Sequence, residues 1–418
     1  MLHRGRAPGG LSWRRAARTL AVLALALATG GCAATLARNA LPEVLADEAE
    51  LSGMTGVRLW GDAGAQNLEA LVKVEAPKIK ARAAAAAAGG RPLVSNFLAI
   101  SGGAEDGAFG AGLLVGWSAG RTRPTFDLVT GVSAGALIAP FVFLGPGHDD
   151  RLKEIFTMYG REDILAVNLA SGLFGGAAIA DSAPLAHLIE RYVDQRFLRE
   201  VAQERQKGRV LLIGTTNLDA QRPVLWDMGR IAASGHPQAL ALFRKVLLAS
   251  ASIPGAFPPV RFQVRAGEHA YEELHVDGGV TQQVSLAPAA LAFGALDKAA
   301  GVQVRRRLYV IRNGKITPEW QPVDERALSI AQRSISTLTK YQGIGDLYRL
   351  HATAKRDGIE FNLAAIPASF TQKGKEPFDR DYMRALFELG FEQGRRGYAW
   401  IKAPPELSGP SPTSGAAR

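Results

Sequence analysis

One serine of this sequence stands where a nucleophile could be presented. Ser133 is the centre of a Gly-x-Ser-x-Gly motif, between an apolar run at 126–129 and a second one at 136–143. A strand, a sharp turn and a helix in this order form a nucleophile elbow, in which Gly131 and Gly135 let strand and helix approach closely. The N–H groups at the start of the helix favour negative charge beside the serine. This context favours Ser133 as a catalytic nucleophile; the alternative is a small residue in a tight turn.

A second stretch, 97–117, predicts another strand, a glycine-rich loop and a helix. The loop lacks the Gly-Lys-Ser/Thr of a P-loop, and its two acidic residues would repel a phosphate group. Backbone N–H groups aimed at a developing oxyanion fit better, and each is worth about 3 kcal/mol in known cases. The alternative is a loop whose glycines only let the helix pack on the strand. The candidate donors are Gly102, Gly103, Ala104 and Gly107.

A third stretch, 274–280, predicts a strand that ends at an acid. Asp277 is followed by Gly278 and Gly279. Polar groups of α/β sites gather at the ends of strands beside flexible backbone. Taken alone, however, Asp-Gly-Gly is more often a turn than a catalytic base.

The elements that must hold these residues alternate between strand and helix. This alternation predicts an α/β fold layered around a mostly parallel sheet. We expect no cofactor, and the seven histidines show no metal-ligand spacing. The expected strands are 93–101, 126–131, 209–217, 273–279, 306–313 and 359–366, and the expected helices are 107–119, 134–144, 182–195, 237–250, 325–355 and 379–402.

The three stretches, in this order, resemble the patatin-like phospholipase family. A fourth, 249–259, is similar to the Ala-Ser-x-x-x-Pro-x-x-Phe segment of that family. The resemblance covers 97–280 and implies a three-layer α/β/α sandwich with a central, mostly parallel sheet. It also implies a lipid acyl hydrolase, with Ser133 as the nucleophile, Asp277 as the base and the glycine loop as the oxyanion hole. The implied substrate is a membrane phospholipid or another acyl-ester lipid.

The glycine loop departs from the family pattern at two positions. Ala104 stands where the family usually has a third glycine, and Asp106 stands where it has a basic residue. We expect Ala104 to donate its N–H if its φ is negative. Asp106 is expected to cap the helix that begins near Gly107.

Two other interpretations remain open. A Ser–His–Asp triad would need a histidine after the acid, and His351 alone qualifies, inside a predicted helix. His275 shares a strand face with Asp277 and is expected to be a packed histidine. In the second interpretation the chain is a non-catalytic, lipid-anchored envelope protein that keeps the fold to bind a lipid or a partner.

The N-terminus predicts export. Residues 1–31 combine five arginines, a short apolar stretch and small residues, which is typical of a secretory signal. Cys32, the single cysteine, then resembles the lipidated cysteine of bacterial lipoproteins. The expected location is therefore the bacterial cell envelope, facing the periplasm, with membrane attachment through a lipid anchor.

Charge and composition suggest the partners and the boundaries. The net charge of +10 falls to +5 without 1–31, since 44 basic and 39 acidic residues remain. No concentrated basic face with aromatics predicts nucleic-acid binding. After the signal we expect a helical and linker segment at 32–95, the catalytic domain at 96–292, an α/β part at 293–402 that completes or covers it, and a disordered tail at 403–418.

Overall fold

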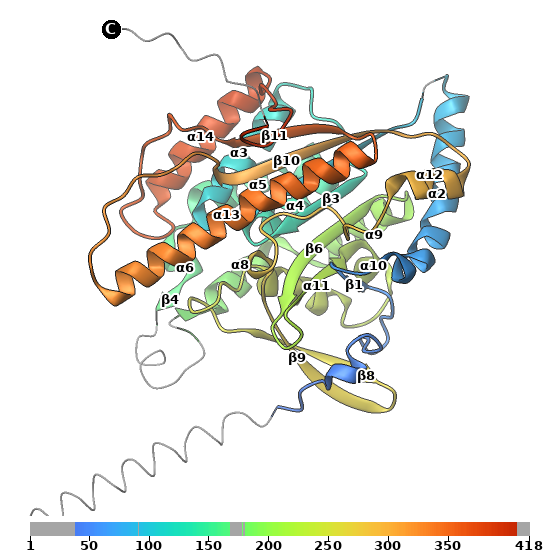
Figure 1. The fold of residues 1–418 in the computed structure, drawn as a ribbon, viewed down its shortest axis with the longest axis horizontal. Coiled ribbons are helices and arrows are strands. Elements are labelled where there is room, and N and C mark those ends of the chain that lie inside the picture. The colour runs from blue at the N-terminus through green and yellow to red at the C-terminus, as the bar shows by residue number, and fades with distance from the viewer. Residues whose placement is uncertain (1–37, 91, 168–177, 179, 408–418) are drawn as a thin grey trace, which may run out of the picture.

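A mixed, mostly parallel sheet forms the centre of the molecule (Figure 1). The structure is a computed structural model that describes residues 38–90, 92–167, 178 and 180–407. The signal segment, Cys32 and most of the C-terminal tail therefore lie outside the described residues. Within the described residues the sheet has nine strands: β1 (Arg58–Trp60), β2 (Val94–Ile100), β3 (Leu128–Val132), β6 (Val210–Asn217), β7 (Arg222–Asp227), β8 (Val260–Ala266), β9 (His269–Asp277), β10 (Arg305–Lys315) and β11 (Glu360–Ile366).

The strand order is β1-β7-β6-β3-β2-β10-β11, and β9 pairs with β6 and β8. The run from β6 to β11 is parallel, whereas β1, β7, β8 and β9 pair antiparallel. The parallel strands are buried on both faces, which explains their continuous apolar runs. All six strands expected from sequence are present. A separate, two-stranded sheet joins β4 (Ala166–Val167) to β5 (Ala180–Asp181).

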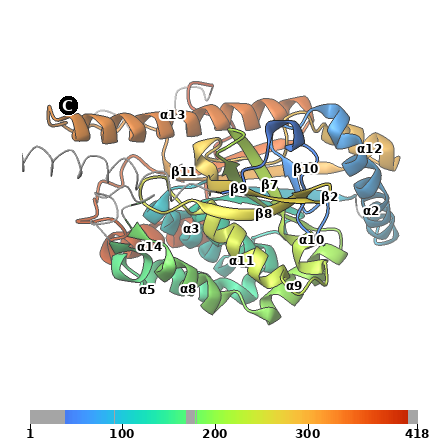
Figure 2. The same ribbon diagram turned by 90° about the horizontal axis from the view of Figure 1, so that it is seen from below.

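Helices cover both faces of the sheet, so the molecule has three layers (Figure 2). One apolar core lies between the sheet and the larger helix layer, and a second lies under the smaller layer. The larger layer holds α3 (Gly107–Ala119), α4 (Ala134–Leu144), α5 (Asp149–Met158), α6 (Arg161–Ile164), α8 (Ala183–Tyr192), α9 (Gln195–Gln206), α10 (Met228–Ala233), α11 (Ala239–Ser250) and α14 (Arg380–Arg396); the smaller holds α2 (Glu69–Ala88), α12 (Phe293–Ala300) and α13 (Ala327–Arg356).

The segment before residue 95 is helical in part, as expected, and it also packs onto the domain. β1 pairs with β7 at the end of the sheet, and Leu51, Met54 and Val57 are buried in the larger core. The alanine-rich stretch is the last part of the 20-residue helix α2. Strand β1 is difficult to predict from the sequence because it has only three residues and its partner, β7, lies more than 160 residues later in the chain.

The C-terminal part belongs to the same sheet. β10 pairs with β2 over seven residues, and β11 pairs with β10. Helix α14 ends at Arg396, before the expected residue 402, because Gly397 adopts a φ of 89°. Among the described residues no helix is both long and apolar enough to span a membrane.

Candidate active site

Ser133 occupies the turn between β3 and α4. Its backbone adopts φ 55° and ψ −124°, a conformation that side-chain-bearing residues rarely take. The turn is held from outside, because the Ser133 N–H donates to Ser250 Oγ at 3.0 Å. Ser250 Oγ in turn donates to the Gly214 carbonyl at 2.6 Å. Ser250 lies in the fourth stretch of the family resemblance, and its role could not be read from the sequence.

The two glycines of the motif are required by close backbone contacts. A Cβ at Gly131 would lie 2.3 Å from the Gly135 carbonyl oxygen, and one at Gly135 would lie 2.3 Å from that of Ile100. Strand and helix therefore approach as closely as backbone allows. Any larger residue would push Ser133 out of the turn.

Asp277 ends β9 beside this turn. One carboxylate oxygen, Oδ1, accepts the Gly279 N–H at 2.7 Å, while Oδ2 is buried without a hydrogen-bond partner. The Ser133 hydroxyl lies near enough to lower the pKa of the carboxyl group, although the two do not reach the geometry of a full hydrogen bond. Such looseness is common in unliganded sites.

The environment of Asp277 makes it a stronger base than an ordinary aspartate. Burial raises its pKa to about 6, while Ser133 and the Gly279 N–H oppose this rise. The carboxylate is thus ionised near neutral pH and binds a proton more readily than one with a pKa near 3.8. Asp277 is a buried acid beside the Ser133 hydroxyl, and one of its carboxylate oxygens, Oδ2, has no hydrogen-bond partner. These are the properties of a proton acceptor.

The glycine loop after β2 supplies fewer free N–H groups than we expected. The Gly102 N–H donates to the Gln283 carbonyl at 3.0 Å, and the Gly107 N–H bonds the Ala104 carbonyl. The proposed set of four donors is therefore corrected to Gly103 and Ala104, whose N–H groups have no acceptor among the described residues. Gly102 still matters sterically, because its added Cβ would lie 3.0 Å from that of Ser133.

Ala104 corrects a further expectation. Its φ is 48°, not negative, so it adopts the left-handed conformation that a glycine would take without strain. The chain is forced into this path because Gly103 passes close to β10: a Cβ there would lie 2.3 Å from the Asn313 carbonyl oxygen. The family's glycine is replaced here at a conformational cost, and the turn is kept.

The last residues of β10 brace the loop, which sequence reasoning missed. The Asn313 amide donates to the Ser101 carbonyl at 2.8 Å, and its oxygen accepts the Gly110 N–H at 3.0 Å. Buried Arg312 donates to the Gly102 carbonyl at 3.3 Å. A polar pair at the end of an apolar strand was the available signal, but the loop that it contacts is about 210 residues away.

Asp106 does not cap α3. Its side chain makes no capping bond and instead accepts a hydrogen bond from the Tyr382 hydroxyl. Burial raises the pKa of Asp106 to about 6, although the Tyr382 bond lowers it. Because Asp106 has helical φ and ψ, its carboxylate is not placed over the N–H groups of the next turn.

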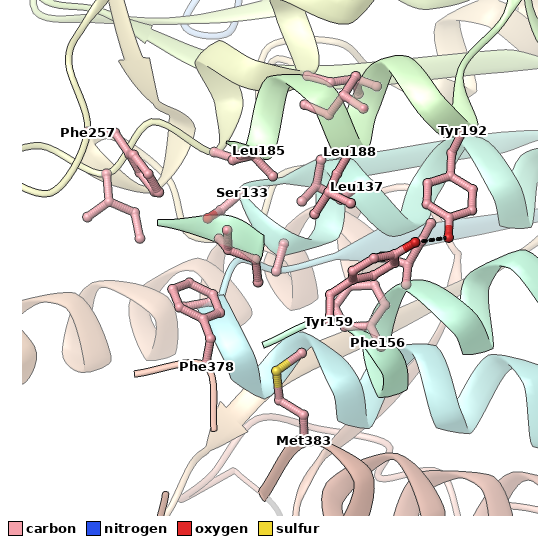
Figure 3. A pocket seen from close by; sticks show the side chains of 18 of the residues that line it. Ser133, Leu137, Phe156, Tyr159, Leu185, Leu188, Tyr192, Phe257, Phe378 and Met383 are labelled. Atoms are coloured by element: carbon pink, nitrogen blue, oxygen red, sulfur yellow. Dashed lines mark hydrogen bonds between the residues drawn. The ribbon is translucent and has the colours of Figure 1, made fainter. Parts of the chain in front are cut away.

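An apolar pocket of about 90 Å³ opens at Ser133 (Figure 3). Ser133 and a hydrogen-bonded tyrosine pair, Tyr159 and Tyr192, lie at opposite sides of it, and the two hydroxyl oxygens are 2.7 Å apart. The guanidinium of exposed Arg191 lies over both rings on the outside. The tyrosine pair thus separates the pocket from solvent. The rest of the wall is formed by apolar side chains that include Leu137, Phe156, Leu185, Leu188 and Phe257.

Neither histidine considered from the sequence contacts Ser133. His275 is fully buried, with one ring nitrogen 3.1 Å from Glu273 and the other 2.9 Å from the Thr215 hydroxyl. His351, on α13, makes an edge-to-face contact with Phe361 of β11. The described residues contain no cluster of three or more metal-ligating side chains. The site is therefore built around a serine and an aspartate.

Fold and site together define an α/β/α protein with a nucleophile elbow, in which Ser133 and Ala104 line an apolar pocket and the buried acid Asp277 lies beside the serine. Residues 98–290 match the family model described as patatin-like phospholipase, so this part of the chain is similar to that family. The family's description indicates lipid acyl hydrolase activity.

Two other comparisons add little. No curated protein matches the chain at a significant level. Among solved structures, the chain is similar to VipD from Legionella pneumophila, with a TM-score of 0.36 and 12% identity over 73% of this chain and 67% of that one. A likeness this weak carries no argument about activity.

Proposed function

We propose that the protein is a serine lipid acyl hydrolase that cleaves fatty acyl esters of membrane lipids with a Ser133–Asp277 dyad. The observation that carries this proposal is the pocket at Ser133, whose wall is formed almost entirely by apolar side chains. An acyl chain gains about 0.8 kcal/mol for each CH₂ group that it buries. A polar or charged substrate would gain nothing from such a wall.

The reaction follows from the two side chains and the free amides. Asp277 takes the Ser133 proton as Ser133 Oγ attacks the ester carbonyl, and the carbonyl oxygen becomes an oxyanion held by the N–H groups of Gly103 and Ala104. The carbon–oxygen bond to the alcohol then breaks, and Asp277 returns its proton to the leaving alcohol. Water, deprotonated by Asp277, attacks the acyl-enzyme, and the fatty acid leaves as Ser133 regains its proton.

Covalent labelling tests the nucleophile. A fluorophosphonate probe phosphonylates an activated serine, so the wild-type protein should take up one label, mapped to Ser133 by peptide mass spectrometry. Ser133→Ala should take up none, and Ser336→Ala, at an exposed helical serine, should label like wild type. A label on another serine, or none on a folded wild-type protein that still binds lipid, would favour the non-catalytic binding interpretation.

We also propose that the protein is a lipoprotein of the bacterial envelope, anchored through Cys32. The support is the sequence of 1–32 alone, which lies outside the described residues. One acyl chain holds a protein to a membrane only weakly, whereas two or more hold it firmly. Full-length protein should therefore stay in the membrane fraction through a high-salt wash, and Cys32→Ser should be released or left unprocessed. Complete release of the wild type by salt would contradict this anchor.

A further inference from the structure

The first half of α13 and the segment before it carry large apolar side chains that no described residue covers. We call this surface the α13 face. Its members are Trp320, Leu328, Ile335, Leu338 and Tyr341, which are 86%, 70%, 64%, 70% and 62% exposed. Soluble proteins rarely expose so many large apolar side chains together, and such patches mark interaction sites.

The helical members form one stripe. Leu328, Ile335 and Leu338 are spaced by seven and three residues, which places them on the same side of a helix. Figures 1 and 2 show the first half of α13 extending past the body of the domain. Its second half packs normally, with Leu347 and Leu350 buried in the smaller core. The stripe therefore is not the inner face of a packed helix.

The middle of α13 lies beside the candidate active site. A Cβ at Gly343 would lie 2.9 Å from the guanidinium of Arg312, which donates to the Gly102 carbonyl in the glycine loop. Next to it, the Gln342 amide donates to the Val280 carbonyl, three residues after Asp277. From Gly343 back to Ala327 the helix runs about 24 Å at 1.5 Å per residue.

The charges of the α13 face are mixed. The helix from 326 to 345 carries Arg326, Arg333 and Lys340, whereas the segment before it carries Glu319, Asp324 and Glu325, and Lys340 forms an ion pair with Glu319. Arg333 and Lys340 donate to the Glu319 and Thr317 carbonyls and so hold the preceding segment, with Trp320, against the helix. Apolar and aromatic side chains in one helical surface fit the interface of a bilayer, where Trp and Tyr lie at the level of the headgroups.

We propose that the α13 face docks onto the surface of a lipid bilayer and brings the Ser133 site to the membrane. The partner is a lipid surface and not a second copy of the chain, because the same helix contacts the segment that follows Asp277 and the arginine that holds the glycine loop, so that docking would place the proposed site beside its lipid substrate. The benefit of docking, access of membrane lipid to Ser133, rests on the proposed function. Its test does not depend on hydrolysis, so the two can fail separately.

The test compares two double variants of the full chain, each carrying Cys32→Ser so that no acyl anchor contributes. Leu328→Glu/Ile335→Glu places two charges in the stripe. Ser329→Glu/Ser336→Glu places the same charges at the same spacing, but about 100° around the helix. Binding is measured by flotation with vesicles of phosphatidylcholine and phosphatidylglycerol, and activity is measured on those vesicles and on a soluble butyryl ester.

We expect the stripe variant to bind the vesicles at least tenfold more weakly than the Ser329→Glu/Ser336→Glu control. Its hydrolysis of vesicle lipid should fall in parallel, while its hydrolysis of the soluble ester stays within twofold. Trp320→Ala, a smaller change at a fully separate position, should weaken vesicle binding in the same direction.

Three results would overturn the docking proposal. The protein with Cys32→Ser alone could fail to float with the vesicles, or both double variants could lose binding equally. Alternatively, wild type could be a dimer in sedimentation that the stripe variant alone converts to monomers without a change in vesicle binding, which would assign the face to a second copy. Face-dependent binding without hydrolysis of either ester would leave docking intact and refute the proposed activity.

Discussion

Replacement of Asp277 by asparagine should remove activity and stabilise the fold. A carboxyl group whose pKa is raised by folding favours the folded state while it is protonated, and this contribution is lost as the pH rises through its folded pKa. For Asp277 the shift from 3.8 to about 6 corresponds to about 3 kcal/mol at 1.36 kcal/mol per unit. Above pH 6 the wild type carries this cost, whereas the neutral amide of Asp277→Asn does not.

The predicted signature is a stability difference that depends on pH. Denaturant unfolding should show Asp277→Asn to be about 3 kcal/mol more stable than wild type at pH 8, and less than about 1 kcal/mol more stable at pH 4. Ester hydrolysis by the variant should be nearly as low as that of Ser133→Ala, because members of one catalytic unit are not additive. If the difference in the free energy of unfolding between Asp277→Asn and wild type were absent, negative or independent of pH, the assigned burial of Asp277 would be refuted.

A second acid of the same strand provides a control of opposite sign. Burial would raise the pKa of Glu273, but hydrogen bonds with His275 and Arg58 lower it to about 2. A depressed pKa stabilises the fold above the unfolded value and loses this effect as the pH falls. Glu273→Gln should therefore destabilise the protein at pH 8, where Asp277→Asn stabilises it, and should not abolish hydrolysis.

Three further outcomes follow from the same geometry. The kcat/KM for a soluble ester should rise with pH through about 6, as Asp277 loses its proton; a profile that is flat from pH 5 to 8 would contradict its role as base. Ala104→Gly should keep activity and raise stability by up to about 1 kcal/mol, since it relieves the positive φ; a clear loss of stability in denaturant unfolding would argue against the assigned turn. Tyr159→Ala should open the far end of the pocket and raise kcat/KM for longer acyl esters relative to short ones, whereas Tyr159→Phe keeps the ring and should not; identical chain-length profiles would remove the tyrosine pair as the limit.

Features set by neighbouring residues were accessible from the sequence. Helices α3 and α4 begin and end at the expected residues, because apolar runs and glycines fix those boundaries locally. The turn at Ser133 was also predictable, because Gly131 and Gly135, both within two residues of it, are needed where strand and helix leave no room for a side chain. By contrast, the antiparallel strands β7 and β8 were missed, although β8 alternates between buried and exposed residues, the usual mark of a half-buried strand.

Contacts between distant segments were decided only by the tertiary structure. From the sequence alone, Asp277 resembles a turn residue. In the structure β9 pairs with β6, so that Asp277 lies opposite Thr215, and β6 in turn pairs with β3, which brings Asp277 to the end of β3. The crossing from β2 to β10 likewise sets Asn313 against Gly103, forces Ala104 to a positive φ and leaves two amides free. Sequence determines which residues can turn, donate or ionise, because those properties are local. Which of them meet, and how far burial shifts a pKa, depends on strand order and register, because these alone bring residues more than 100 positions apart into contact.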